Sequence, residues 1–209
     1  VVPSDMDGDG VIGGISFDYT ALDTTGYVRA LVDFTYAKDV RELRELTRGL
    51  VGNMLYMGAV DQDGSAFFTS YQAVPCRGYL PRDEDRAWLP GADPTMLIDG
   101  TTYGGFTIPT FVNGVVDEGP GNNKPDHCVV PFDDTPTVID PPWGYVVNAN
   151  DQPAPIHADG TMTDDPWYIG GPWWSTRAHS IAQGIEAAIE DGSADVAAMS
   201  AIQGDQRSR

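Results

Sequence analysis

The amino-acid sequence predicts an α+β chain with long irregular segments. Three observations carry this prediction. A capped, amphipathic helix that begins after Asp39 leads into an Asp-Gly hairpin, and two further helices are expected near the C-terminus. Gly and Pro account for 24 and 16 of the 209 residues, a content that favours turns and short elements over a helical bundle.

The charge balance excludes two classes of partner. The chain carries 31 acidic and 12 basic side chains, which gives a formal charge of −19 at neutral pH. Nucleic-acid backbones and anionic lipid surfaces would be repelled, so we expect no nucleic-acid partner.

No stretch approaches the roughly 18 uncharged apolar residues of a membrane span. The apolar fraction of 41% is nevertheless sufficient for an ordinary globular core.

Residues 1–16 contain an acidic loop with the front half of a calcium-binding pattern. Asp5, Asp7 and Asp9 alternate along the chain and are followed by a glycine and an apolar pair. The position where an EF-hand requires a bidentate Glu is Ser16, so a complete EF-hand is not predicted. Two interpretations remain open: a looser calcium loop with the three aspartates as ligands, or an acidic turn exposed to solvent.

Residues 37–80 are predicted to form a helix followed by a hairpin. Asp39 and Glu42 fit a capping box, and Arg41 and Glu45 are spaced to pair on the outer face. The apolar face of the helix consists of Val40, Leu43, Leu46 and Leu50. The helix should end near Gly49 or Gly52.

The hairpin is predicted from a strand over 53–57, an Asp-Gly turn over 61–64 and a second strand over 66–71. Asp61 and Asp63 resemble a metal site, but turn chemistry explains them more simply.

The second half of the chain is predicted to be irregular first and helical later. Residues 81–142 are rich in Pro, Gly and Asp and should form a long irregular segment with a few short strands. Residues 143–209 should contain a strand over 144–150 and two C-terminal helices. The expected apolar positions of these helices are Ala178, Ile181, Ile185 and Ile189 in the first, and Val196, Met199 and Ile202 in the second. Gly192 is expected to end the first helix and Ser193 to cap the second.

No self-contained catalytic motif is visible in the sequence. The three histidines have no metal-ligand spacing, and neither a nucleophile elbow nor a phosphate-binding or dinucleotide-binding loop is present. No organic cofactor is therefore expected. Cys76 and Cys128 have no zinc spacing, and either one disulfide or two buried thiols would fit them.

The order of four short segments resembles the penicillin amidase family of N-terminal-nucleophile hydrolases. The first is the capped helix running into Asn53, the Asp-Gly hairpin and Pro75-Cys76-Arg77. The others are residues 130–132 with 141–153, residues 174–181, and residues 202–205. Each segment is weakly specific, but the ordered set spreads from about residue 37 to residue 209 and is more specific than any one of its members.

The resemblance implies a partial four-layer α-β-β-α fold and hydrolysis of a linear amide, such as a β-lactam side chain or an acyl-homoserine lactone. It also implies a heterodimer cut from one precursor, in which the first residue of the β chain is the nucleophilic serine. The α-amino group of that serine acts as the base, because an amine with a pKa of about 8 accepts a proton near neutral pH.

The same resemblance implies that this chain is an internal part of the β subunit. Residue 1 is Val1, and no serine in the chain is followed by Asn, as the processing site of the family usually is. We therefore expect residues 1–209 to be a single fragment that lacks the nucleophile and is inactive alone. The expected partners are the α subunit, the remainder of the β subunit and a small-molecule amide.

Two catalytic residues are implied by the resemblance. Asn53 matches the asparagine whose side-chain amide donates to the oxyanion, and Arg77 matches an arginine that orients that asparagine. From position alone, Asn53 would be interpreted as a turn residue after a helix, and Arg77 as the partner of a nearby carboxylate.

Two hypotheses of different classes follow. The first is an exported, periplasmic or secreted amidohydrolase fragment with a structural calcium ion. The alternative is a non-catalytic extracellular calcium-dependent binding module that uses the acidic N-terminal loop.

Overall fold

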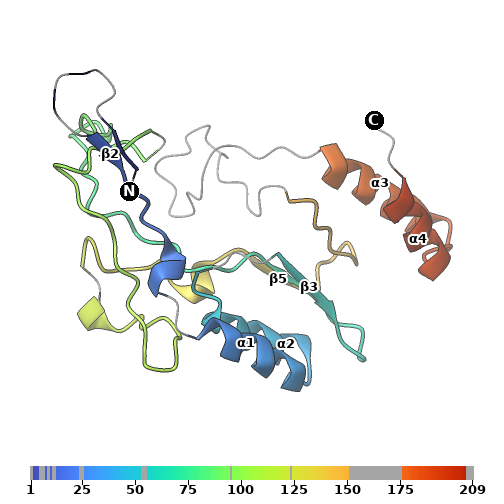
Figure 1. Ribbon diagram of the computed structural model, residues 1–209. Helices are drawn as coiled ribbons and strands as arrows, with labels where there is room; N and C mark the ends of the chain where they lie inside the picture. The colour runs from blue at the N-terminus through green and yellow to red at the C-terminus, as the bar shows by residue number, and fades with distance from the viewer. Residues whose placement is uncertain are drawn as a thin grey trace.

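The computed structural model of the protein combines helices with antiparallel strands, which confirms the α+β class (Figure 1). It describes residues 2–4, 8, 10, 13–23, 26–52, 56–94, 96–122, 124–150 and 176–205. Among these residues, no helix has the length and hydropathy needed to cross a lipid bilayer.

A three-stranded antiparallel sheet forms the centre of the molecule. Its strands are β3 (Met57–Val60), β4 (Ala66–Thr69) and β5 (Thr137–Ile139), in the order β3-β4-β5. The central strand β4 pairs Phe68 with Gly58 on one side and with Val138 on the other. The sheet therefore joins the local hairpin to a strand about seventy residues later in the chain, which lies inside the segment predicted to be irregular.

The β3–β4 turn confirms the predicted hairpin and its turn chemistry. The Asp61 carboxylate accepts hydrogen bonds from the backbone N–H groups of Asp63 and Ser65, at 3.1 and 3.0 Å. Gly64 adopts a φ of 85°, which a side chain would disfavour. The first strand lies later than predicted, over Met57–Val60, and residues 53–55 are outside the described residues.

Helix α2 (Val40–Leu46) has the predicted cap. The Asp39 carboxylate accepts from the N–H groups of Arg41 and Glu42, and Glu42 in turn accepts from the Lys38 N–H at 2.8 Å. A 3₁₀ turn over Thr47–Gly49 ends the helix where it was expected to end. The predicted Arg41–Glu45 pair is wrong: Arg41 instead contacts Asp140 at 2.8 Å, because β5 brings that carboxylate to the same side of the helix.

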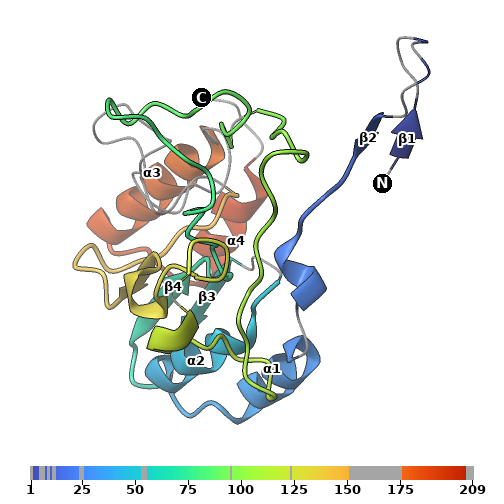
Figure 2. The same cartoon turned by 90° about the vertical axis from the view of Figure 1, so that its left-hand side faces the viewer.

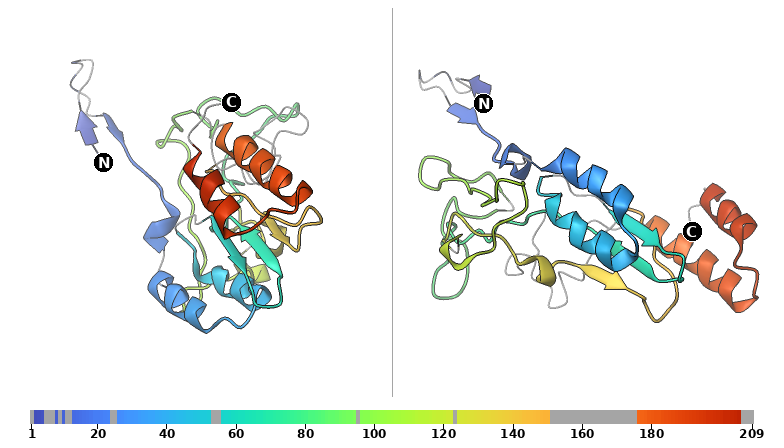
Figure 3. Two further views of the ribbon diagram at one scale, coloured as in Figure 1. Left: turned by 90° about the vertical axis from the view of Figure 1, so that its right-hand side faces the viewer. Right: turned by 90° about the horizontal axis from the view of Figure 1, so that it is seen from below.

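Helix α1 (Tyr27–Asp33) packs against the 3₁₀ turn over Thr47–Gly49 at a point where each element carries a small residue. A Cβ atom on Gly49 would lie 2.7 Å from the Ala30 Cβ, so a side chain at residue 49 would push α1 away. In the left panel of Figure 3, α1 and α2 lie below the sheet and the C-terminal helices above it.

Phe132 occupies the centre of the contact between α2 and the irregular segment. Its side chain is 1% exposed, and the guanidinium carbons of Arg44 and Arg48 lie 4.5 and 3.8 Å from its ring centroid. Tyr71 packs against the same ring in a T-shaped arrangement, with centroids 4.9 Å apart. Asp133 pairs with both arginines, at 3.0 and 3.6 Å, so ion pairs and cation–ring contacts stabilise the same contact between α2 and the irregular segment.

Residues 81–142 are largely irregular, as predicted, and are organised by turns. Besides β5, the segment contains short 3₁₀ turns over Pro120–Asn122 and Phe132–Asp134. Glu118 fixes it near the second turn by accepting a 2.7 Å hydrogen bond from the Phe132 N–H.

The strand predicted over 144–150 does not form. Among the described residues they have no ladder partner, although the Val146 side chain lies 3.8 Å from the position that a Cβ on Gly58 would take. The segment instead connects to helix α3 (Thr176–Glu190): the Tyr145 hydroxyl and Glu186 are 2.6 Å apart, and Arg177 donates to the Ala149 carbonyl at 2.6 Å.

Helix α4 (Val196–Gly204) follows α3 as an antiparallel pair. Gly192, with φ 74°, ends α3 as predicted, and the Ser193 N–H bonds back to the Ala188 carbonyl at 2.9 Å. Ser193 was predicted to cap α4, which is wrong. Asp195 is the cap, because its carboxylate is the group that reaches the Ala198 N–H, at 2.8 Å.

The apolar faces predicted for this helical pair are only partly buried. Ile202 lies against Gly184, where an added Cβ would be 3.1 Å away, whereas Ile189 and Val196 are 47% and 87% exposed.

The N-terminus forms a separate hairpin of β1 (Val2–Ser4) and β2 (Gly13–Ile15), which projects from the rest of the molecule (Figure 2). Asp5, Asp7 and Asp9 belong to the connection between these strands and lie outside the described residues.

Replacing Phe132 with Ala should lower the free energy of unfolding by about 3–5 kcal/mol, because it empties a buried ring site and removes two cation contacts. Urea denaturation of the variant checks this. Phe17→Ala, at a side chain that is 85% exposed, is the matched control and should change stability little. A Phe132→Ala loss no larger than that of the control would contradict the central role of this ring.

The burial of Tyr71 predicts a loss of stability at alkaline pH. Burial, aided by the nearby Glu118 carboxylate, raises the pKa of Tyr71 above its usual value of 10.0. The unfolded chain therefore releases the Tyr71 hydroxyl proton at a lower pH than the folded chain does. The contribution of Tyr71 to the free energy of unfolding is complete below about pH 10 and declines as the pH rises further. Urea unfolding at several alkaline pH values measures the slope. Tyr71→Phe should reduce it, and Tyr36→Phe, at a side chain that is 72% exposed, should not.

Candidate functional site

The segment that leads to Arg77 begins in a buried contact with the chain just before position 53. The Ala73 N–H donates to the Val51 carbonyl at 3.1 Å. Val51 is fully buried and Ala73 is 2% exposed, and both belong to a core cluster that also contains Ile108, Val116 and Val129. This contact therefore holds the residues just before position 53 next to the residues that lead to Arg77.

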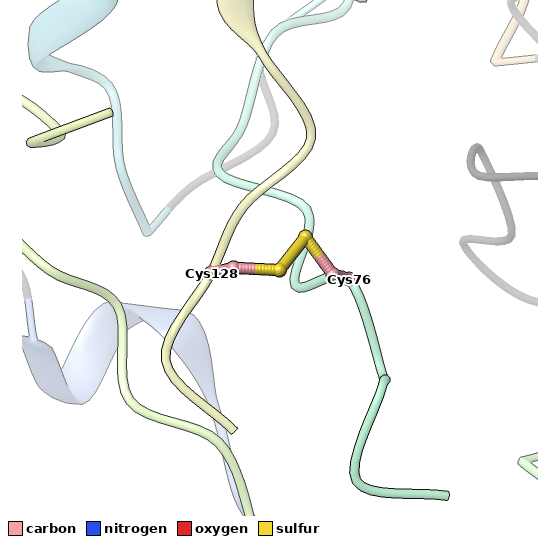
Figure 4. The surroundings of a disulfide bond; sticks show 2 residues. All are labelled: Cys76 and Cys128. Carbon is pink, nitrogen blue, oxygen red and sulfur yellow. A yellow bond between two sulfur atoms is a disulfide. The ribbon is translucent and has the colours of Figure 1, made fainter. Parts of the chain in front are cut away.

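The same segment pairs on its other side with residues 128–130. The Val130 N–H donates to the Val74 carbonyl at 2.8 Å, and the Cys76 N–H donates to the Cys128 carbonyl at 3.1 Å. Cys76 and Cys128 form a disulfide across this ladder, with Cα atoms 5.6 Å apart (Figure 4). Of the two interpretations left open by the sequence, the disulfide is therefore the one that the structure adopts.

Arg77 leaves the ladder in a left-handed backbone conformation. Its φ is 54°, in a region that residues other than Gly, Asn and Asp seldom occupy. A turn follows directly, in which the Leu80 N–H donates to the Arg77 carbonyl at 3.0 Å. The side chain of Arg77 is half-buried. Strained backbone of this kind is concentrated at functional sites.

Charged and titratable groups gather around this turn. Burial raises the pKa of Tyr79, the positive charge of Arg77 opposes that rise, and the negative charge of Asp18 adds to it. Asp18 is fixed by the Phe106 N–H, which donates to its carboxylate at 2.7 Å. Asp18 and Tyr79 were not singled out from the sequence, because no local pattern links residues that lie about sixty positions apart.

Asn53 lies outside the described residues, so its predicted place beside Arg77 stays a prediction. The described residues on either side of it are well packed: Val51 and Gly52 are buried, and Tyr56 is half-buried with its ring 6.1 Å from that of Phe68.

The predicted metal ligands are likewise not placed. Asp5, Asp7 and Asp9 are outside the described residues, and among the residues that are described no group of three or more His, Cys, Asp or Glu side chains is arranged to hold a metal ion.

Comparison with known proteins gives one match that covers nearly the whole chain. The sequence model of the penicillin amidase family matches residues 2–209. The chain belongs to this family. No curated protein sequence matches it.

Membership places the chain among hydrolases that act on amide bonds, and it is consistent with a precursor that is processed into subunits. It thereby confirms the resemblance inferred from the four ordered segments. The catalytic roles of Asn53 and Arg77 rest on the order of these segments and stay predictions.

The left-handed conformation of Arg77 makes a prediction about stability. Arg77→Gly should be more stable than Arg77→Ala by about 1 kcal/mol, because Ala retains the steric cost of positive φ. The order should invert at Arg29, a helical and exposed position in α1, where Gly is the worse residue by about 1 kcal/mol. Urea denaturation of the four variants measures both differences. An Ala variant as stable as the Gly variant at residue 77 would contradict the observed backbone.

Proposed function

We propose that residues 1–209 are a fragment of the β subunit of an amidohydrolase that cleaves a linear amide bond, such as a β-lactam side chain or an acyl-homoserine lactone. The observation that carries this proposal is the match of the penicillin amidase family to residues 2–209. The α subunit and the remainder of the β subunit would complete the enzyme, and this chain alone would be inactive.

The proposed fold of the complete enzyme is the four-layer α-β-β-α sandwich. The described part supports it with an antiparallel sheet that carries helices α1 and α2 on one side. The subdivision of the chain into an acidic loop over 1–16, a helix and hairpin over 37–80, an irregular segment over 81–142 and a helical end over 143–209 is part of the same proposal.

The proposed mechanism begins with a serine at the start of the β chain, in polypeptide outside this chain. Its hydroxyl oxygen attacks the amide carbonyl carbon while its own α-amino group takes the hydroxyl proton. The carbonyl oxygen becomes an oxyanion, and collapse of the tetrahedral intermediate expels the amine, which receives the proton. Water then hydrolyses the acyl-serine ester by the same steps.

Asn53 is the proposed donor to the oxyanion. An amide N–H aimed at that oxygen stabilises the transition state more than the substrate, because the negative charge is present only as the intermediate forms. The 3.1 Å hydrogen bond between Ala73 and Val51 supports this role, because it anchors the chain two residues before Asn53. Arg77 is proposed to orient the Asn53 amide and is a positioning residue.

Two further elements of the proposal concern calcium and location. We propose Asp5, Asp7 and Asp9 as ligands of a structural calcium ion in the β1–β2 connection. A periplasmic or secreted location is supported by the Cys76–Cys128 disulfide, since disulfides persist in oxidising compartments. The family match favours the amidohydrolase over a non-catalytic calcium-dependent module.

The decisive experiment is an Asn53→Ala substitution in the processed full-length enzyme. We expect kcat to fall by roughly 10²–10³-fold with little change in KM, because the lost donor acts on the transition state. Hydrolysis of a chromogenic phenylacetyl anilide, a side-chain-bearing penicillin and an N-acyl-homoserine lactone would be measured in parallel, which also identifies the acyl group preferred.

Gln62→Ala is the matched control, because it removes another carboxamide from an exposed turn. It should keep wild-type kcat. If Asn53→Ala retained kcat within a few-fold of the parent, the oxyanion assignment would fail, and a full-length enzyme inactive on all three amides would remove the support for the proposed substrates.

A further inference from the structure

Both neighbours of Arg77 are held by one short turn, residues 124–128. Cys76 is bonded to Cys128 at the end of this turn, as Figure 4 shows. Gly78 packs against its start: a Cβ at residue 78 would lie 3.2 Å from the Pro125 Cα and 3.3 Å from the Pro125 carbonyl oxygen. Arg77 is therefore enclosed between two contacts to the same turn.

The turn is itself fixed to the body of the molecule. The His127 N–H donates to the Lys124 carbonyl at 3.0 Å, which closes the turn, and the Thr107 N–H donates to the Asp126 carbonyl at 2.9 Å. Val129, the residue after Cys128, is 9% exposed and belongs to the same core cluster as Val51 and Ala73. A displacement of residues 76–78 would therefore have to break their contacts with this turn or move the turn against the body of the molecule.

The backbone conformation of Arg77 requires constraints on both sides of this residue. An arginine with a φ of 54° keeps that backbone only where the surroundings determine it. The ladder ends at Cys76 and the next backbone bond, from the Leu80 N–H to the Arg77 carbonyl, belongs to the following turn. The disulfide and the Gly78–Pro125 contact are two constraints that act directly beside this residue.

We propose that the turn over residues 124–128 is a clamp that positions Arg77 for amide hydrolysis, with Cys76, Cys128, Gly78 and Pro125 as positioning residues. This inference rests on the proposed function, in which Arg77 orients the oxyanion donor. The clamp sets the direction of the Arg77 side chain by fixing the backbone on both sides of it, so its loss misplaces the guanidinium without removing it.

The first test opens the disulfide in the processed full-length enzyme. Dithiothreitol is oxidised to its cyclic disulfide while each cysteine sulfur gains a hydrogen, so two electrons and two protons are transferred. We expect kcat to fall roughly 10–100-fold, because small misplacements near a reacting centre have effects of this size, with KM little changed. Reoxidation should restore kcat. The Cys76→Ser/Cys128→Ser double variant should show the same loss and no response to dithiothreitol.

The second test disturbs the clamp with the disulfide intact. In Gly78→Ala the new methyl group would lie 3.2 Å from the Pro125 Cα, so the contact between residue 78 and the turn must open by a few tenths of an ångström, and kcat should fall. Gly121→Ala is the matched control, because a Cβ there meets no atom within 4 Å, and it should keep wild-type kcat.

The third test separates positioning from general stability by a double-mutant cycle. In an Arg77→Ala background, opening the disulfide and Gly78→Ala should produce no additional loss of kcat, since the group they position is gone. A purely structural clamp would lower kcat by the same factor in both backgrounds, and that result would overturn the proposal.

The outcomes distinguish failure of the clamp from failure of the proposed function. If kcat depends on Arg77 but survives both reduction and Gly78→Ala, the clamp is wrong and the proposed function stands. If Arg77→Ala and Asn53→Ala both retain wild-type kcat, the catalytic assignment itself fails and the clamp fails with it.

Discussion

The contact on which the described structure depends most is the enclosure of the Phe132 ring. Two guanidinium groups lie over the ring, 3.8 and 4.5 Å from its centroid, and Tyr71 packs against it in a T-shaped arrangement. In a chain with a net charge of −19, Arg44 and Arg48 each make two kinds of contact here: they lie over the ring and they pair with Asp133. The irregular segment has few ladders of its own, so a buried anchor of this kind determines where it runs along α2 and the sheet.

The same contact supports the candidate site through a continuous series of neighbours. Phe132 shares a core cluster with Leu50 and Tyr71, and these residues precede Val51 and Ala73, which join the second cluster. From Ala73 the backbone ladder continues to Cys76 and its disulfide, and Arg77 follows. The two cores are therefore coupled by adjacent residues of the chain, and the turn that bears Arg77 lies at the end of the second core.

Sequence reasoning was accurate where the decisive interaction spans four residues or fewer. The Asp39 cap, the Asp61 turn and the Gly192 stop were all predicted, because each depends on a side chain or a glycine acting on its own neighbourhood. It was wrong where two local solutions compete, as for Ser193 and Asp195, and where a distant strand intervenes, as for Arg41, which pairs with Asp140 ninety-nine positions away. The strand expected over 144–150 has the right composition, but among the described residues it pairs with neither edge strand of the sheet, β3 or β5.

The sequence by itself determined the α+β class, the helix-and-hairpin unit and membership of the penicillin amidase family. Capping and turn chemistry depend on residues that are close together in the chain, and the order of the four segments can be read along it. Only the tertiary structure decided that Cys76 joins Cys128 across 52 positions, that Arg77 adopts positive φ, and that Phe132 lies under Arg44 and Arg48. Each of these depends on which segments meet in space. That choice is made by burial summed over the whole core, to which any single stretch of sequence contributes only a small part.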